Sequence, residues 1–252
     1  MVIILYKEKR WQKIIDTLDF AFQPIVDSKS YELYGVEALL RNYDFAGFKS
    51  IADVFDTAYK ENYLYNLDLK LRFKALKKFR EIKNFKNIKL FYNLDNRVLE
   101  LSNFNMGATE LELDRNDIEK SSFIFEISEK HKFINFLEVN EIFCIYKKLG
   151  FKIAIDDFGS GFANMQELLN IETDIVKIDR FFIKDIENSN RKQLIVRNLV
   201  KLIHEIGSLI VAEGVETEKE YKMCNRLGCD LIQGYYISKP TQNIMEINQI
   251  YN

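Results

Sequence analysis

Proline, cysteine, histidine and glycine are all scarce in this chain of 252 residues, which has 2 Pro, 3 Cys, 2 His and 10 Gly. So little proline and glycine leaves no room for a low-complexity linker. The cysteines (Cys144, Cys224 and Cys229) are odd in number and form no C-x-x-C pair, so we expect reduced thiols, mostly in the core of a cytoplasmic protein. Neither a signal peptide nor an apolar run of membrane-spanning length is visible, so we expect no membrane span.

An excess of positive charge is also lacking. The formal net charge is −2, which argues against a DNA-binding protein with a broad cationic face but still allows a local pocket for a phosphate ligand. Hydrophobic residues make up 47% and charged residues 29%, as is typical of a globular protein with a substantial core. The length suits one large domain, such as an alternating barrel of about 250 residues, or two small domains.

The first forty residues predict a helix followed by a β-hairpin. Lys7–Leu18 is charged and amphipathic, and we expect a helix here, in an N-terminal segment (residues 1–18) that precedes a barrel domain (residues 19–252). Phe20–Val26 and Tyr31–Leu39 predict two strands, with Pro24 near a strand end or on an edge. Because so short a connection cannot cross over, these strands should be antiparallel.

The remaining chain alternates between apolar strands and amphipathic helices. Further strands are predicted at Ile88–Leu94, Phe123–Ile127, Phe151–Asp156, Ile175–Ile178, Leu209–Glu213 and Asp230–Ile237. Helices are predicted at Asp53–Glu61, Asn66–Lys83, Phe136–Leu149, Ala163–Leu169, Arg191–Ile206, Thr217–Leu227 and Asn243–Tyr251, with helical material before Leu111. Such alternation is typical of a parallel sheet covered by helices, and eight strands favour the α/β class, as a closed (β/α)8 TIM-like barrel.

Helix boundaries carry their usual residues. Gly150, Gly207 and Gly228 stand where a left-handed residue would end a helix. Thr217 with Glu220 predicts a capping box at the start of a helix, and Asn190 with Gln193 predicts a weaker one.

Polar residues recur near the predicted carboxyl ends of the strands. They are Gln23, Glu37, Asn93, Glu126, Asp156 with Asp157, Lys177 with Asp179, Glu213 and Gln233. In a barrel of this kind these ends converge on the mouth that carries active sites. Five of the carboxylates would converge beside Asn93 and would repel one another unless cations neutralise them or some become protonated; they are Glu37, Glu126, Asp156, Asp157 and Glu213.

The donor types indicate which cation would bind. All are oxygen donors without His or Cys, so Mg²⁺ or Mn²⁺ fits better than Zn²⁺. Two such ions and a lysine suit phosphoester hydrolysis, because they activate a water and neutralise the phosphate. Arg41, just beyond the second strand, could hold a second phosphate.

Structural interpretations remain open for several of these residues. Asp156-Asp157 alone could be a solvated exit from a strand, and Lys177 could be an interior lysine paired with Asp179 or Glu213. No Ser-His-Asp arrangement is visible, and we expect His131 and His204 on the surface or on helices. Glu129 and Glu216 could be solvated, or could orient the loop after Asp157 or the metal ligands.

Eight motifs resemble one known family in order and spacing. They are Gln23-Pro-Ile25, Gly35-Val-Glu-Ala-Leu-Leu-Arg41, Tyr92-Asn-Leu94, Glu126-Ile-Ser-Glu129, Asp156-Asp-Phe-Gly-Ser-Gly161, Val176-Lys-Ile-Asp179, Ala212-Glu-Gly-Val-Glu216 and Gln233-Gly-Tyr-Tyr-Ile-Ser-Lys-Pro240. The chain thereby resembles the EAL domain, from about Phe20 to Pro240. The family takes its name from the triplet that stands here as Glu37-Ala-Leu39.

The resemblance implies a cytoplasmic bacterial phosphodiesterase that hydrolyses the second messenger cyclic di-GMP to linear pGpG on a barrel with an antiparallel first strand. It places one metal at Glu37, Asn93, Glu126 and Asp156, and a second at Asp156, Asp157 and Glu213. It places Lys177 beside the nucleophilic water, with Gln233 in support. It implies substrate contacts from Gln23, Leu39, Arg41 and Asp179, and bracing roles for Glu129 and Glu216. It further implies a homodimer and a sensor or regulatory partner.

One loop departs from the family pattern. Gly161-Phe-Ala-Asn-Met165 stands where the family has Gly-Tyr-Ser-Ser-Leu, so the loop lacks hydroxyls that could support hydrogen bonding and dimer coupling. Two alternatives follow: a catalytically weak EAL domain that acts as a cyclic di-GMP receptor or interaction module, and a different metal-dependent barrel enzyme acting on a carboxylate or sugar phosphate. Because no proposed metal ligand is replaced, the sequence favours the phosphodiesterase.

Overall fold

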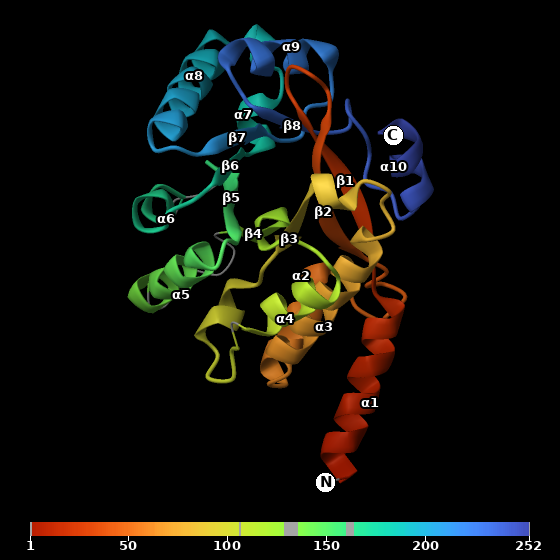
Figure 1. The fold of residues 1–252 in the computed structure, drawn as a ribbon. Coiled ribbons are helices and arrows are strands. Elements are labelled where there is room, and N and C mark those ends of the chain that lie inside the picture. Colours follow the sequence, from red (N-terminus) through yellow and green to blue (C-terminus); the bar gives the residue numbers. More distant parts are fainter. Residues whose placement is uncertain (1, 106, 129–135, 160–163, 252) are drawn as a thin grey trace.

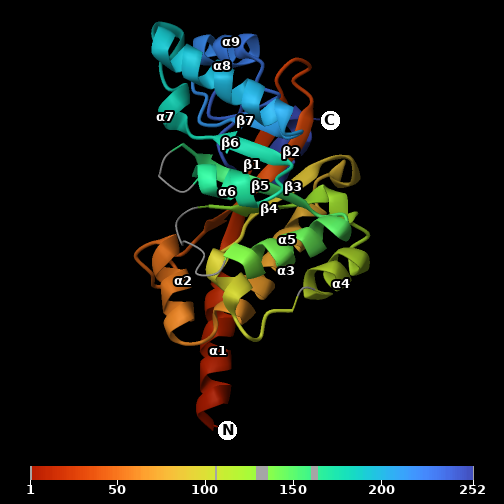
Figure 2. The same ribbon diagram turned by 90° about the vertical axis from the view of Figure 1, so that its left-hand side faces the viewer.

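The chain forms a closed eight-stranded barrel surrounded by helices (Figures 1 and 2), described by a computed structural model over residues 2–105, 107–128, 136–159 and 164–251. The strands follow sequence order around the barrel: β1 (Asp19–Asp27), β2 (Leu33–Arg41), β3 (Lys89–Asn93), β4 (Phe123–Ile127), β5 (Lys152–Phe158), β6 (Ile175–Ile178), β7 (Leu209–Ala212) and β8 (Leu231–Gln233). The predicted barrel is therefore confirmed.

Ten α-helices lie in the described part of the chain. They are α1 (Val2–Thr17), α2 (Ile51–Lys60), α3 (Leu64–Phe79), α4 (Gly107–Arg115), α5 (Phe136–Lys148), α6 (Asn164–Asn170), α7 (Arg180–Ile183), α8 (Asn190–Glu205), α9 (Glu218–Leu227) and α10 (Ile244–Ile250). Short 3-10 turns occur at Phe85–Asn87, Asn96–Glu100, Lys120–Ser122 and Ile186–Asn188. Helix α1 extends away from the barrel in both views (Figures 1 and 2). Among the described residues, no helix combines the length and the apolar character needed to cross a membrane.

Strand β1 runs against the direction of both its neighbours, β2 and β8, as the short hairpin connection predicts. The position predicted for Pro24 is wrong, because it lies in the interior of β1 rather than near an end or an edge. The N–H of Phe22 donates to the carbonyl of Thr241 at 2.8 Å, and pairing with β8 begins only at Ile25. Pro24 therefore occupies a gap between two contacts, where its missing N–H costs no hydrogen bond.

Most predicted helix boundaries are confirmed. Gly150, Gly207 and Gly228 are left-handed, with φ of 96°, 85° and 94°, where helices end. The predicted cap at Asn190 is wrong: the preceding Ser189 caps α8 and accepts from the N–H of Lys192 at 3.3 Å. Two further differences are α7, which the pattern did not predict, and β8, a strand of three residues that ends at Gln233 rather than at Ile237.

The barrel interior holds a layer of apolar side chains of its own, separate from the larger core between barrel and helices. It consists of Ile25, Phe91, Ile124, Ala154, Ile175, Val211 and Leu231. At the level of this layer β2 carries Gly35, where a Cβ would lie 2.6 Å from the carbonyl oxygen of Lys89 and 3.0 Å from the ring of Phe91. The neighbouring Tyr34 of β2 is partly buried and packs against the layer. The interior below the mouth is therefore packed, which leaves the mouth itself as the place for a site.

The capping box at the start of α9 gives a prediction for stability. The Thr217 side chain accepts from the N–H of Glu220 at 3.1 Å, and the Glu220 carboxylate accepts from the N–H of Thr217 at 3.0 Å. Thr217→Ala should lower the free energy of unfolding by about 1 kcal/mol in chemical denaturation. Thr17→Ala is the control, since its exposed hydroxyl only donates back to Lys13 within α1; equal losses in both variants would contradict the capping role.

Candidate functional site

A ring of polar side chains lies above the apolar layer, two residues further along most strands. Side chains two residues apart in a strand point to the same face, so each inward apolar residue is followed two positions later by an inward polar one. The steps are Phe91 to Asn93, Ile124 to Glu126, Ala154 to Asp156, Ile175 to Lys177, Val211 to Glu213 and Leu231 to Gln233, with Gly35 to Glu37 in β2. The strand pattern therefore brings these predicted residues together at one mouth.

Gln23 reaches the ring in a different way. The sequence prediction that it marks a carboxyl end is wrong, since β1 is antiparallel and Gln23 lies in its middle, opposite Glu37 in the register. It precedes the inward Ile25 by two residues instead of following it. The side-chain Oε1 of Gln23 accepts from Nε2 of Gln233 at 3.3 Å, and Nε2 of Gln23 donates to the backbone carbonyl of Ser238 at 3.2 Å.

Lys177 lies at the centre of the acidic ring and is fully buried. Its Nζ lies 2.5 Å from Glu126 Oε1, 2.8 Å from Glu213 Oε1, 2.9 Å from Asp156 Oδ1 and 3.2 Å from Glu37 Oε2. One ammonium thus faces four carboxylates from four different strands or strand ends. Because a buried charge is stable only when it is paired, each of these groups depends on the others.

Burial, together with the excess of acid, raises the pKa of part of the ring. Burial raises the pKa of Glu126 well above its ordinary range, and the neighbouring Glu37 and Asp156 carboxylates raise it further. Burial likewise raises the pKa of Glu213, against a partial opposing effect of Lys177. Lys177 itself remains protonated: burial opposes its charge, but the surrounding carboxylates outweigh burial and raise its pKa.

Glu37 is stabilised in its ionised form although it is buried. Burial would raise its pKa, but Lys177 and two amides outweigh burial, so the pKa of Glu37 lies below its ordinary value. Asn93 Nδ2 donates to Glu37 Oε1 at 2.8 Å and to Glu126 Oε2 at 3.1 Å, and Gln233 Nε2 donates to Glu37 Oε2 at 2.7 Å. The two amides thereby fix the orientation of the Glu37 carboxylate.

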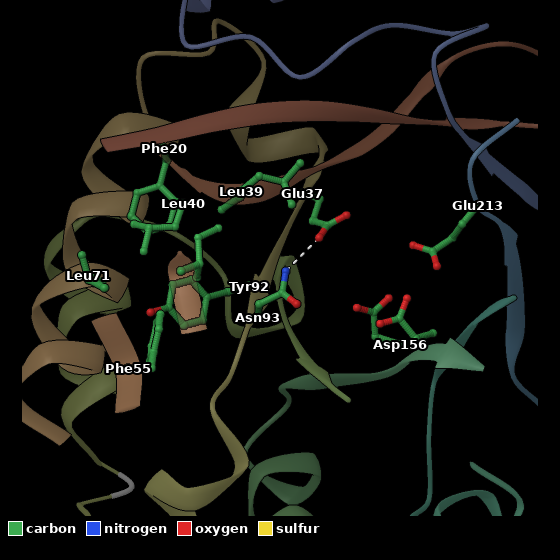
Figure 3. A pocket seen from close by; sticks show the side chains of 13 residues that line it. Phe20, Glu37, Leu39, Leu40, Phe55, Leu71, Tyr92, Asn93, Asp156 and Glu213 are labelled. Atoms are coloured by element: carbon green, nitrogen blue, oxygen red, sulfur yellow. Dashed lines mark hydrogen bonds between the residues drawn. The ribbon is translucent and has the colours of Figure 1, made fainter. Parts of the chain in front are cut away.

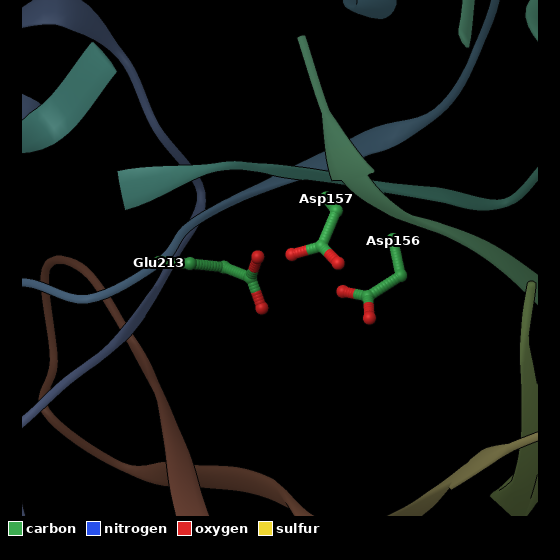
Figure 4. Close-up of side chains that lie close together, drawn as sticks. All are labelled: Asp156, Asp157 and Glu213. Atoms are coloured by element: carbon green, nitrogen blue, oxygen red, sulfur yellow. The ribbon is translucent and has the colours of Figure 1, made fainter. Parts of the chain in front are cut away.

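Asp156, Asp157 and Glu213 form the group best suited to a divalent cation. One oxygen of each lies within 4.8 Å of the others, and the three carboxylates point toward one another (Figure 4). Asp157 is the residue that breaks the strand alternation: its φ is 53°, and the pairing register of β5 shifts between Ile155 and Phe158. This local distortion lets two adjacent Asp residues serve one site inside the strand, which continues to Phe158 rather than ending at Asp156 as predicted.

The chemistry of these donors fits the predicted ions. Carboxylate and amide oxygens prefer hard cations such as Mg²⁺ and Mn²⁺. A cation here would also offset the surplus negative charge that Lys177 leaves uncompensated.

A cavity of about 320 Å³ opens beside the acidic ring. Figure 3 shows its two parts: acids with Asn93 on one side, and an apolar wall on the other. The wall contains Phe20, Leu39, Leu40, Ile51, Phe55, Leu71 and Tyr92. Of the predicted substrate contacts, Leu39 lines this cavity. The contributions of Ile51 and Phe55 from α2 were not predicted, because their helical spacing reads as ordinary core packing.

Other predicted residues lie around this centre. Arg41 ends β2, four residues or about 13 Å along the strand from Glu37, and its Nη1 donates to the carbonyl of Leu40 at 2.9 Å. Asp179 caps α7 by accepting from the N–H of Phe181 at 2.7 Å, rather than pairing with Lys177. Glu216 forms an ion pair with Arg180 at 2.6 Å.

Some predictions concern other parts of the chain. Glu129, His131 and residues 161–163 of the departing loop lie outside the described residues. His204 is on α8 and half-exposed, as predicted, with Nε2 2.8 Å from Asp230. The three cysteines are free thiols, and Cys224 and Cys229 are buried, as predicted.

Known proteins share this sequence pattern. Residues 9–240 match the family model of the EAL domain. A cyclic di-GMP phosphodiesterase of Pseudomonas aeruginosa is 30% identical to this chain over 87% of this chain and 38% of that protein. The cyclic di-GMP phosphodiesterase PdeF of Escherichia coli is 36% identical over 55% of this chain and 18% of that protein. The chain thus spans between 17% and 38% of the length of the first three curated relatives that it matches.

Solved structures share the fold. A standalone versatile EAL protein from Vibrio cholerae, in its c-di-GMP bound form, superposes with a TM-score of 0.74 at 29% identity, over 89% of this chain and 92% of that chain. A manganese and cyclic di-GMP complex of BlrP1 from Klebsiella pneumoniae superposes with a TM-score of 0.79 at 28% identity, over 89% of this chain and 56% of that chain.

The position of Lys177 gives a prediction for charge balance. Lys177→Met removes the central ammonium but keeps a chain of similar length, so buried carboxylates lose their counter-charge. The free energy of unfolding, measured at pH 8 in chelator, should fall by about 3–5 kcal/mol. Lys222→Met breaks only an exposed ion pair with Glu218, which solvent screens, and should leave the free energy of unfolding nearly unchanged. A Lys177 variant as stable as the Lys222 control would show that the ring does not depend on its lysine.

Proposed function

The chain belongs to the EAL domain family, and from this membership we propose that it hydrolyses cyclic di-GMP to linear pGpG and so ends a bacterial second-messenger signal. The observation that carries the proposal is the acidic ring beside a partly apolar cavity. This arrangement joins a place for cations and phosphate to a place for the less polar parts of a nucleotide.

The proposed ligands fall into two overlapping sets. Glu37, Asn93, Glu126 and Asp156 would hold one Mg²⁺ or Mn²⁺, and Asp156, Asp157 and Glu213 would hold a second. The amide donors of Asn93 and Gln233 already fix Glu37, so this ligand needs little reorganisation. Bound ions of this kind lower the pKa of a water and neutralise an attacked phosphate.

The residues of the chain would then divide the remaining work. Lys177 would hold the carboxylates at a fixed spacing and present positive charge beside the attacking water. Gln233 would support the same region through Glu37. Gln23, Leu39, Arg41 and Asp179 would contact the substrate, with Leu39 in the cavity wall and Arg41 further along β2. Glu216, through its ion pair with Arg180, would brace the loop that follows β7.

Other parts of the proposal depend on family membership alone. These are a cytoplasmic location, a homodimer and a sensor or regulatory partner that controls activity. The main alternative function is a cyclic di-GMP receptor that does not hydrolyse its ligand. The intact set of acids favours hydrolysis, since a receptor has no need for a buried ring of mutually repelling carboxylates.

The test is incubation of the purified protein with cyclic di-GMP and Mn²⁺, with and without chelator, followed by chromatography of the products. We expect pGpG with Mn²⁺ and none with chelator. Glu37→Ala removes a proposed ligand together with the acceptor of both amides, and turnover should fall at least a hundredfold, or about 2.7 kcal/mol on the barrier. Glu205→Ala, which alters only an exposed residue of α8, should keep wild-type turnover.

Two outcomes would count against this proposal. Binding of cyclic di-GMP by the wild-type protein without any pGpG would support the receptor instead. A Glu37→Ala variant with more than a tenth of wild-type turnover under saturating Mn²⁺ would refute the assignment of Glu37 as a ligand.

A further inference from the structure

Helix α7 lies between the end of β5 and the loop after β7, the two segments that carry the candidate cation ligands. It follows β6, so its first residue comes three positions after Lys177. The loop after β7 begins with Glu213, and the end of β5 carries Asp156 and Asp157. Both segments contact the β6–α7 connection directly.

On the β7 side the contact is made by Arg180. Its Nη1 donates to the carbonyl of Gly214, and its Nη2 pairs with Glu216 Oε2 at 2.6 Å. Gly214 has a φ of 63°, and a Cβ there would lie 2.8 Å from side-chain carbons of Arg180. The backbone of the residue after Glu213 is therefore packed against the arginine side chain as well as hydrogen-bonded to it.

Glu213 is anchored on its other side too. Its own N–H donates to the carbonyl of Ile178 at 3.1 Å. The backbone is thus held on both sides of the Glu213 side chain, at the N–H of Glu213 and at the carbonyl of Gly214. Both partners belong to the segment from Ile178 to Arg180.

Glu216, the ion-pair partner of Arg180, is also held in place at its backbone. The N–H of Glu216 donates to the buried carboxylate of Glu220 at 2.8 Å, and the other oxygen of Glu220 accepts from the N–H of Asp185 at 3.0 Å. The backbone of Glu216 is therefore fixed, and its partly exposed side chain reaches Arg180 from a defined position.

On the β5 side the contact is made by Phe182. A Cβ at Gly159, two residues after Asp157, would collide with the Phe182 ring, so glycine is required for this approach. In addition, the N–H of Asp179 donates to the carbonyl of Phe158 at 3.2 Å. Helix α7 therefore touches the segments of both ligand groups.

We propose that Arg180 is a positioning residue, which sets the place of Glu213 relative to Asp156 and Asp157 and thereby tunes cation affinity. The inference rests on the proposed function, because it requires these three acids to bind a divalent cation. Arginine suits the task since its planar fork reaches a carbonyl and a carboxylate at once, which a lysine cannot do with the same geometry.

Mn²⁺ binding to the full chain, measured by calorimetry and by electron paramagnetic resonance, tests this role without reference to turnover. Arg180→Met should raise the dissociation constant for Mn²⁺ by about ten- to a hundredfold, as is usual for groups that orient ligands. The Mn²⁺ dissociation constant of Arg180→Lys should lie between those of Arg180→Met and the wild type. In both variants the Mn²⁺ concentration for half-maximal turnover should rise, with a smaller change in kcat at saturating Mn²⁺.

A matched control separates positioning from general destabilisation. Asn243→Ala removes the N-cap of α10, which accepts from the N–H of Met245, and should lower the melting temperature without changing Mn²⁺ affinity. If Arg180→Met, like this control, keeps the wild-type Mn²⁺ affinity, the positioning role is overturned while the cation site itself stands. If Arg180→Met does not fold, Arg180→Lys takes its place, and an unchanged Mn²⁺ affinity in that variant overturns the positioning role in the same way. If the wild-type protein and Asp156→Asn bind Mn²⁺ equally, the cation site fails, and the proposed mechanism fails with it.

Discussion

The repulsion between carboxylates gathered at the barrel mouth is the constraint on which the site depends. Glu37, Glu126, Asp156 and Glu213 share one buried ammonium, Lys177, at distances between 2.5 and 3.2 Å. A single positive charge cannot balance them, and the raised pKa values of Glu126 and Glu213 follow from burial together with this imbalance. The ring is therefore poised to accept further positive charge, which is the physical basis for the proposed binding of cations and, through those cations, of a phosphate group.

The barrel makes this concentration of charge possible because the charged side chains lie only two residues along the strand from the apolar layer, yet outside it. An apolar layer closes the interior, and the next inward side chain of most strands is polar. Two departures complete the site: antiparallel β1 brings Gln23 from the opposite direction, and the left-handed Asp157 adds an acid that strict alternation would turn away. The short helix α7 then joins the segments that hold these acids.

Much of the fold and most of the ring could be predicted from the sequence, because both follow from periodicity. Parallel strands with helices between them leave few arrangements, and the polar residues after buried strands indicated a common mouth. Features that arise from tertiary packing could not be predicted in the same way. Pro24 lies inside β1 because a gap in pairing accommodates it, and Ser189 rather than Asn190 caps α8 because capping depends on the local backbone angles. The apolar wall from Ile51 and Phe55 resembles core packing until α2 is placed beside the mouth.

We infer that Asp156, Asp157 and Glu213 together bind a divalent cation in this chain. Crystals grown with Mn²⁺, measured at the manganese absorption edge, test this claim most directly. We expect anomalous density in contact with carboxylate oxygens of Asp156, Asp157 and Glu213, with Lys177 still buried beneath them. Ordered Mn²⁺ elsewhere in the crystal, with no anomalous density between these three side chains, would contradict it.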